Sequence, residues 1–146
     1  MPDKPTSIKN IAIAGRPGSD EVLHEGESIR AWLEERGITV LLTRTDDPAL
    51  IEGIGQGAFE LLIALGGDGT MLRAGHLAAP VGLPVLGINL GRFGFLMQLS
   101  RSDWRKTLPR LLAGDYKIES RMMLKAEQWR RGELLSTHQV INEVVV

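Results

Sequence analysis

A short apolar run that ends in glycines constrains this chain more than any other feature. Residues 61–70 read Leu-Leu-Ile-Ala-Leu-Gly-Gly-Asp-Gly-Thr, five apolar residues and then a glycine-rich turn. Such a run is typical of a parallel strand buried on both faces, and Met71–Ala79 continues with helix-forming residues. The glycines therefore form a turn between a buried strand and a helix.

This turn has the chemistry of a phosphate site. Its glycines carry no Cβ, so backbone N–H groups can approach a ligand closely, and the N-terminus of the following helix favours an anion. Asp68 is the exception. A carboxylate repels phosphate unless a divalent cation lies between them, or unless it takes a proton from an attacking hydroxyl. The alternative is that Asp68 caps the helix by accepting the N–H of Thr70 or Met71.

The residues before the turn predict a strand, a helix and a second strand. Ile8–Ala14 forms the first strand, the helix begins at Ser19 and ends at Gly37, and Ile38–Thr43 is a second, β-branched strand. The helix has one apolar stripe, made of Val22, Gly26, Ile29 and Leu33. A unit of this kind is α/β, so we expect an open, mostly parallel sheet flanked by helices.

Two stretches are harder to assign. Residues 44–59 are irregular, although a short helix fits near their middle, and the adjacent Asp46 and Asp47 are more typical of a solvated turn than of a metal site. Residues 102–114 predict a helix with a capping Ser-Asp pair at its start. Because Pro109 lies inside it, that helix either kinks or begins late.

Two polar residues near the expected ligand edge are candidates for binding. Asn89 ends a fourth strand, Pro84–Asn89, beside glycines, where it can meet a ligand or cap a turn. Arg73 lies three residues after Thr70, so it can reach back toward a bound phosphate or carboxylate, or it is an ordinary surface arginine.

The composition changes after Gly114. Two partly alternating runs, 117–129 and 133–146, flank an Arg-Arg-Gly turn and predict an antiparallel hairpin. We therefore divide the chain into an α/β domain over 1–114 and a β segment over 115–146.

Composition points to a small-molecule partner. The 146 residues are 43% hydrophobic, and 17 basic against 18 acidic side chains leave a formal charge of −1. There is no overall field to attract nucleic acid or an anionic membrane, and no run approaches the roughly 20 apolar residues of a membrane span. The absence of cysteine suits a reducing cytoplasm, where we expect the protein to act.

The Gly-Gly-Asp-Gly-Thr motif of residues 66–70 resembles a signature shared by NAD kinases, diacylglycerol and sphingosine kinases and, with Ser for Thr, phosphofructokinases. Their common chemistry is phosphoryl transfer from a nucleotide to a hydroxyl. Two later stretches select among them: Gly87–Leu96 (Gly-Ile-Asn-Leu-Gly-Arg-Phe-Gly-Phe-Leu) and Ile141–Val146 (Ile-Asn-Glu-Val-Val-Val) are similar to the second and third blocks of the NAD kinase family. The order and separation of the blocks also match, and the resemblance extends from about Ile11 to the last residue.

The resemblance implies transfer of the terminal phosphoryl of ATP to the 2′-hydroxyl of the adenosine ribose of NAD, which gives NADP. Mg²⁺ would accompany the ATP and bridge its phosphates. It further implies that Asp68 is the base at the hydroxyl, while backbone amides of Gly67, Gly69 and Thr70 hold phosphate oxygens. Residues assigned to nucleotide binding besides these are Arg73, Asn89, Asn142 and Glu143; none is assigned as a metal ligand.

In that family the chain continues into a larger all-β domain that completes the nucleotide site and supports subunit assembly. The sequence ends on three valines, 144–146, with no residues left to cover the edge of that strand, which suggests a cut chain. We expect a homo-oligomer when the further domain is present. Three hypotheses follow: part of an NAD kinase, a stand-alone nucleotide-binding module without catalysis, or a lipid or sugar kinase of the same superfamily.

Overall fold

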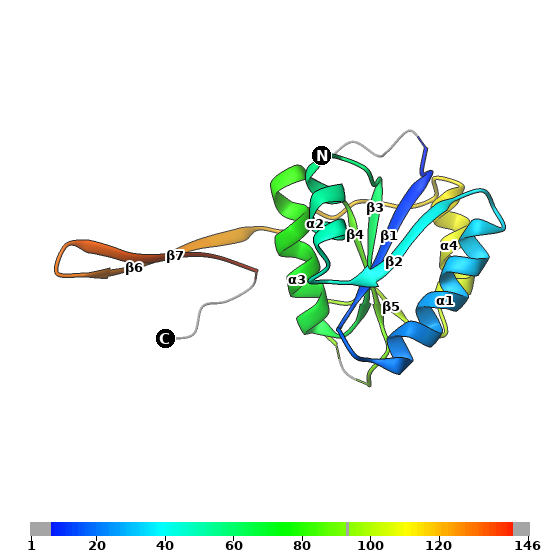
Figure 1. The fold of residues 1–146 in the computed structure, drawn as a ribbon, viewed down its shortest axis with the longest axis horizontal. Helices are drawn as coiled ribbons and strands as arrows, with labels where there is room; N and C mark the ends of the chain where they lie inside the picture. Colours follow the sequence, from blue (N-terminus) through cyan, green and yellow to red (C-terminus); the bar gives the residue numbers. More distant parts are fainter. Residues whose placement is uncertain (1–6, 93, 142–146) are drawn as a thin grey trace.

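The computed structural model describes residues 7–92 and 94–141, and its centre is a five-stranded parallel sheet (Figure 1). In spatial order the strands are β2 (Thr39–Arg44), β1 (Asn10–Gly15), β3 (Leu61–Gly66), β4 (Val85–Asn89) and β5 (Leu99–Ser100). All four neighbouring pairs run parallel. The predicted open, parallel α/β sheet is confirmed.

Helices cover both faces of this sheet (Figure 1). One face carries α1 (Asp20–Glu34) and α4 (Trp104–Leu112), and the other carries α2 (Pro48–Gly55), α3 (Asp68–Ala78) and the 3₁₀ turn η1 (Ala79–Val81). Along β3, Ile63 and Leu65 pack toward α1 and α4, whereas Leu62 and Ala64 pack toward α2 and α3. Each face therefore has its own apolar core. No helix in the described ranges has the length and apolarity needed to cross a bilayer.

Helix α1 begins and ends where its sequence predicts. The Ser19 hydroxyl accepts the N–H of Val22 at 3.4 Å, as an N-cap does. At the other end Gly37 adopts a φ of +77°, and the Ile38 N–H donates to the Leu33 carbonyl at 3.2 Å. That 6→1 bond is typical of a helix closed by a left-handed glycine. The predicted stripe is buried: Val22, Gly26, Ile29 and Leu33.

The irregular stretch after β2 contains a helix, α2, longer than the short one that its sequence suggested. Asp47 caps it, because the carboxylate accepts the N–H of Ala49 at 2.9 Å and also the hydroxyl of Thr43. The Thr43 hydroxyl, together with that amide, lowers the pKa of the Asp47 carboxyl. Asp46 pairs with Arg44 at 2.9 Å. Asp46 thus lies in a turn, as the pattern predicted, whereas the capping role of Asp47 was not predicted.

The sheet and α4 differ from expectation in two details. The two-residue strand β5 was not predicted, because two residues carry no periodic pattern. Helix α4 begins at Trp104, five positions before Pro109, so a late start was the wrong alternative. Pro109 is exposed, while Trp104, Leu108 and Leu111 are buried. Packing of that apolar side holds the helix together despite the missing backbone donor.

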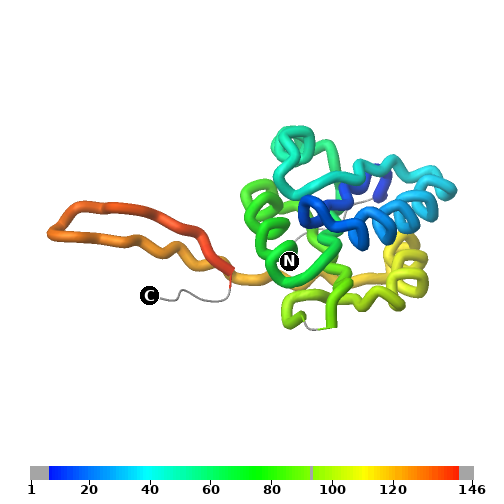
Figure 2. The backbone as a smooth tube through the Cα atoms, turned by 60° about the horizontal axis from the view of Figure 1, so that its bottom comes forward, coloured from blue at the N-terminus to red at the C-terminus, as the bar shows by residue number. Residues whose placement is uncertain are grey.

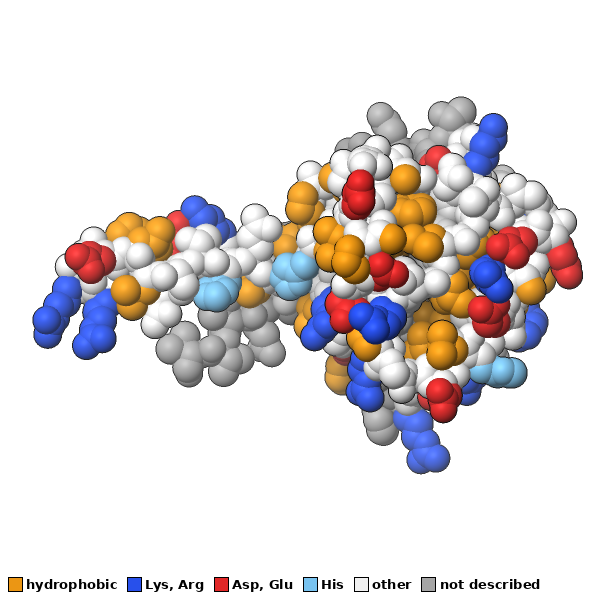
Figure 3. Space-filling model, viewed as in Figure 1, with side chains coloured by type: hydrophobic (Ala, Val, Ile, Leu, Met, Phe, Trp, Pro, Cys, Tyr) orange, Lys and Arg blue, Asp and Glu red, His pale blue; other side chains and the backbone are white. Residues whose placement is uncertain are grey.

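Strands β6 (Met123–Arg130) and β7 (Glu133–Ile141) form the predicted antiparallel hairpin, which projects away from the α/β body (Figures 1 and 2). Arg131 and Gly132 connect the strands with φ values of +50° and +81°, the combination of a type I′ turn. Hydrophobic side chains on the hairpin face solvent (Figure 3): Leu124, Trp129, Leu134 and Leu135.

The base of the hairpin touches helix α3. The His76 Nε2 lies 2.6 Å from the Gln139 backbone oxygen, so this ring nitrogen carries the proton and donates. Ile141 packs against Gly75, where a Cβ would come within 2.5 Å of the isoleucine Cδ1. These contacts fix where β7 leaves the body. The boundary near residue 114 remains a prediction.

We predict that hydrogen exchange separates the hairpin from the sheet. Amides of β3 and β4 should exchange at least about a hundredfold more slowly than those of β6 and β7, because the sheet is covered on both faces and the hairpin is not. Residue-resolved exchange at two protein concentrations measures this. Equal, concentration-independent protection would place the hairpin in the same cooperative unit and remove the boundary. The expectation for 142–146 lies outside the described residues.

Candidate functional site

The glycine turn joins β3 to α3 at the carboxyl edge of the sheet, in its central strand. Gly66 has a φ of +154°, and a Cβ there would lie 2.7 Å from the Thr70 hydroxyl oxygen. Thr70 itself is buried, at 8% exposure. Thr70 therefore folds back beneath Gly66, and this packing sets the tightness of the turn.

The other two glycines of the turn leave open space. A Cβ at Gly67 or Gly69 would meet no atom of the described chain within 4 Å. Gly67 is the N-cap of α3 and has no side chain to cover the first helical turn. The backbone at the start of α3 is thus accessible to a ligand, and the helix dipole favours an anion there.

Asp68 is the first residue of α3, but it does not cap the helix. Its Oδ2 accepts the N–H of Phe95 at 3.0 Å, and its Oδ1 accepts the N–H of Leu96 at 3.1 Å. The capping alternative, with Thr70 or Met71 as donor, is therefore wrong for this structure. Two amides of the loop after β4 hold the carboxylate instead.

Gly94 brings this loop close to two candidate residues at once. A Cβ at Gly94 would lie 3.0 Å from the Asn89 Nδ2 and 3.2 Å from the Asp68 Oδ1. Asn89 and Asp68 thus lie on either side of the same glycine, although Asn89 ends β4 and Asp68 begins the helix that follows β3. Asn89 also closes a turn, since its Oδ1 accepts the Gly91 N–H at 3.0 Å. Its Nδ2 remains the part that a ligand could meet.

The remaining predicted binding residues are placed differently. Arg73 lies on α3 and is exposed, one turn beyond the glycines. Asn142 and Glu143 lie outside the described residues. The structure thus brings Asp68, Asn89 and the glycine turn together at one edge, and ligand contact by any of them remains a prediction.

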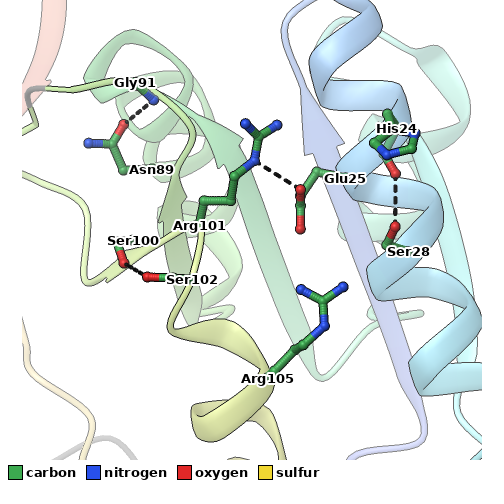
Figure 4. Close-up of a pocket in the computed structure, with 9 residues that line it drawn as sticks. All are labelled: His24, Glu25, Ser28, Asn89, Gly91, Ser100, Arg101, Ser102 and Arg105. Carbon is green, nitrogen blue, oxygen red and sulfur yellow. Dashed lines mark hydrogen bonds and ion pairs between the residues drawn. The ribbon is translucent and has the colours of Figure 1, made fainter.

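A cavity of about 490 Å³ opens beside Asn89, between α1 and the start of α4 (Figure 4). Polar residues are among those that line it, including Ser28, Ser100, Arg101 and Arg105. Sequence reasoning did not find it, because its walls come from elements distant in the chain. At the start of α4, the Ser100 hydroxyl and then the Ser100 backbone amide donate to the Asp103 carboxylate and lower the pKa of that carboxyl.

A buried carboxylate closes one wall of this cavity. Glu25 is 7% exposed and accepts the Trp104 indole N–H at 2.7 Å and the Arg101 Nε at 2.9 Å. Arg101 also pairs with Glu21 at 2.8 Å. Figure 4 shows the Arg101 guanidinium turned toward Glu25. One signal was visible in the sequence, since Glu25 lies on the apolar side of α1, three residues after Val22.

The described residues include no group of three or more His, Cys, Asp or Glu side chains placed to hold a metal ion. Asp68 is a single carboxylate already held by two amides. This arrangement fits a cation that arrives with a phosphate ligand better than one held by a cage of protein side chains.

Comparison with known proteins gives consistent matches. Residues 48–116 match the family model described as the ATP-NAD kinase N-terminal domain. The chain is 40% identical to the NAD kinase of Heliobacterium modesticaldum, over 95% of this chain and 51% of the relative. It is 44% identical to the NAD kinase of Symbiobacterium thermophilum, over 83% of this chain and 45% of the relative. The chain thus spans about half the length of the curated relatives it matches.

A solved structure shares the fold. The crystal structure of yeast NADH kinase complexed with NADH superimposes with a TM-score of 0.63 and 19% identity, and covers 92% of this chain and 46% of that one. At this identity the match supports the architecture alone.

We predict that Trp104→Phe destabilises the α/β body. The change keeps most of the buried ring but removes the indole donor, leaving one Glu25 oxygen without that partner, at a cost of about 1–3 kcal/mol. Urea unfolding measures the difference. Trp129→Phe is the matched control, because its indole donates to Glu127 on the exposed hairpin. That change should stay within about 0.5 kcal/mol, and equal losses in the two variants would contradict the prediction.

Proposed function

Because this chain belongs to the ATP-NAD kinase family, we propose that it supplies the nucleotide-binding part of an enzyme that phosphorylates NAD. The reaction moves the terminal phosphoryl of ATP to the 2′-hydroxyl of the adenosine ribose of NAD and yields NADP. Such transfers depend on positioning and on charge stabilisation more than on covalent chemistry.

The orientation of Asp68 carries the proposal. A carboxylate at the start of a helix in a glycine turn has a cap available, yet Asp68 turns to the loop amides of Phe95 and Leu96. Each oxygen keeps a second lone-pair direction. Asp68 can therefore accept the proton of the ribose hydroxyl while its carboxylate is held in place, a role that contributes typically 10² to 10⁴ in rate.

The open backbone beside Asp68 suits the phosphates. Amides of Gly67, Gly69 and Thr70 at the N-terminus of α3 would hold phosphate oxygens, and the missing side chains at both glycines leave room for them. Mg²⁺ enters as part of the Mg·ATP substrate and neutralises the charge between phosphates and carboxylate.

NAD would be bound by residues around this edge. Asn89 offers its side-chain amide beside Asp68, and Arg73 offers a cation on the exposed side of α3. Asn142 and Glu143 are assigned to ribose hydroxyls or the nicotinamide amide, from their motif alone. A cytoplasmic location and a homo-oligomer formed with a further all-β domain belong to the same proposal.

We predict that Asp68→Asn abolishes NADP formation. The assay supplies Mg·ATP and NAD to the chain alone and to the chain joined to the C-terminal half of the Heliobacterium modesticaldum enzyme. Removing the base should lower the rate at least about a hundredfold. Asp46→Asn, at an exposed turn, is the control and should keep the parental rate.

The outcome distinguishes the hypotheses. NADP formation by either parental protein, lost in Asp68→Asn, supports the kinase assignment. Unchanged turnover in Asp68→Asn would remove the base from the mechanism. Binding of nucleotide without turnover in both parental forms would favour a non-catalytic module.

We predict that Arg73→Ala raises the KM for NAD more than it lowers kcat. The change removes a contact made equally in the ground state and the transition state, and such contacts appear in KM. Initial rates over a range of NAD and ATP concentrations give the two constants. Arg36→Ala, an exposed arginine at the end of α1, is the control. A shift confined to the KM for ATP would assign Arg73 to the other substrate.

A further inference from the structure

We propose that Gln98 is a positioning residue for Asp68 and that it acts through Leu96. Its effect on catalysis rests on the proposed function, whereas its effect on the Asp68 carboxylate does not. Gln98 lies just before β5, outside the three motif stretches 66–70, 87–96 and 141–146.

Gln98 ties the loop to strand β4 with both ends of its side-chain amide. Its Oε1 accepts the Gly87 N–H at 2.6 Å, and its Nε2 donates to the Leu96 carbonyl at 3.2 Å. The Gln98 backbone N–H donates to the Gly87 carbonyl at 3.2 Å. One residue thus bridges the third position of β4 and the loop that holds Asp68.

The need for these bonds follows from the shortness of β5. The pairing of β4 with β5 covers only Ile88 and Asn89, so the Gly87 N–H lies before the ladder begins. The Gln98 side chain supplies the acceptor that a longer β5 would have given. Glycine at 87 leaves the space for it, because a Cβ there would come within 3.0 Å of the Gln98 Oε1 and 2.8 Å of the Met97 Sδ.

Leu96 is held at three points. Its side chain is buried, at 8% exposure, its N–H donates to Asp68, and its carbonyl accepts from Gln98. Fixing the N–H and the carbonyl of one residue fixes both of its backbone dihedrals. Gln98 therefore sets the direction in which the Leu96 N–H points, and through it the place of the Asp68 Oδ1.

This bridge decides between two uses of the same carboxylate. An aspartate at the start of a helix is favoured as a partner of the first-turn amides. In this structure Asp68 accepts the loop amides of Phe95 and Leu96 and not the amides of the first turn of α3. Loosening the loop at Gln98 should let the carboxylate turn back toward the helix, away from a bound ribose.

Two substitutions separate the halves of the bridge. Gln98→Met removes both side-chain bonds with little change in length. Gln98→Glu keeps an acceptor for the Gly87 N–H but has no donor for the Leu96 carbonyl at neutral pH. Gln56→Met is the control, because Gln56 is exposed at the C-cap of α2 and its side chain donates to Glu52.

The readout is the amide spectrum of the chain as it stands, with no substrate present. In Gln98→Met, the amides of Phe95, Leu96 and Gly87 should exchange with solvent at least about tenfold faster. The Gly87 N–H loses its acceptor, and the Phe95 and Leu96 N–H groups lose their fixed position against Asp68. The Phe95 and Leu96 proton resonances should also move toward their positions in Asp68→Asn. In Gln98→Glu, Gly87 should stay protected while Phe95 and Leu96 change.

Activity then tests the catalytic consequence. In whichever form turns over, Gln98→Met should lower kcat at least about tenfold and leave the KM for NAD within about twofold, because misplacing a reacting group affects the chemical step. Unchanged Phe95 and Leu96 amides in a folded Gln98→Met protein would overturn the positioning role. If the Phe95 and Leu96 amides change in Gln98→Met but neither the chain alone nor the joined protein phosphorylates NAD, the positioning role of Gln98 is supported and the kinase assignment is contradicted.

Discussion

Strand β3 is buried on both faces, and this constraint determines most of the architecture. A strand with no solvated face needs a layer above and below it, and between parallel strands such as these the crossover helices supply both layers. Those helices start at one edge of the sheet. The turn that leaves β3 therefore opens at the edge where the ends of β1 and β4 also lie.

The elements that sequence predicts well are those whose causes are local. Ser19 and Gly37 fix the ends of α1 by contacts within a few residues, and the continuous apolar run of residues 61–65 identifies the central strand. The hairpin follows from a turn of two residues with positive φ. In each case the information needed lies inside a window of about one element.

What the sequence could not supply depends on contacts between distant residues. The partners of Asp68 lie 27 and 28 residues further along the chain, so a pattern read around Asp68 leaves its cap and its catalytic role equally open. Glu25 and Trp104 are 79 residues apart, and neither residue type predicts the other. The cavity beside Asn89 has the same origin. The motif predicted where Asp68 lies, and the fold determined that its carboxylate accepts two loop amides and does not cap α3.

Helix α3 serves two structures at once. Its first residue is Asp68, and its later residues Gly75 and His76 hold the base of the hairpin through β7. Eleven helical residues form a stiff rod of about 16 Å. Anything that packs against the hairpin is therefore positioned relative to the same helix axis as the Asp68 carboxylate. A partner that packs against the hairpin end of α3 is therefore held in a fixed position relative to Asp68 at the other end, although the two do not touch.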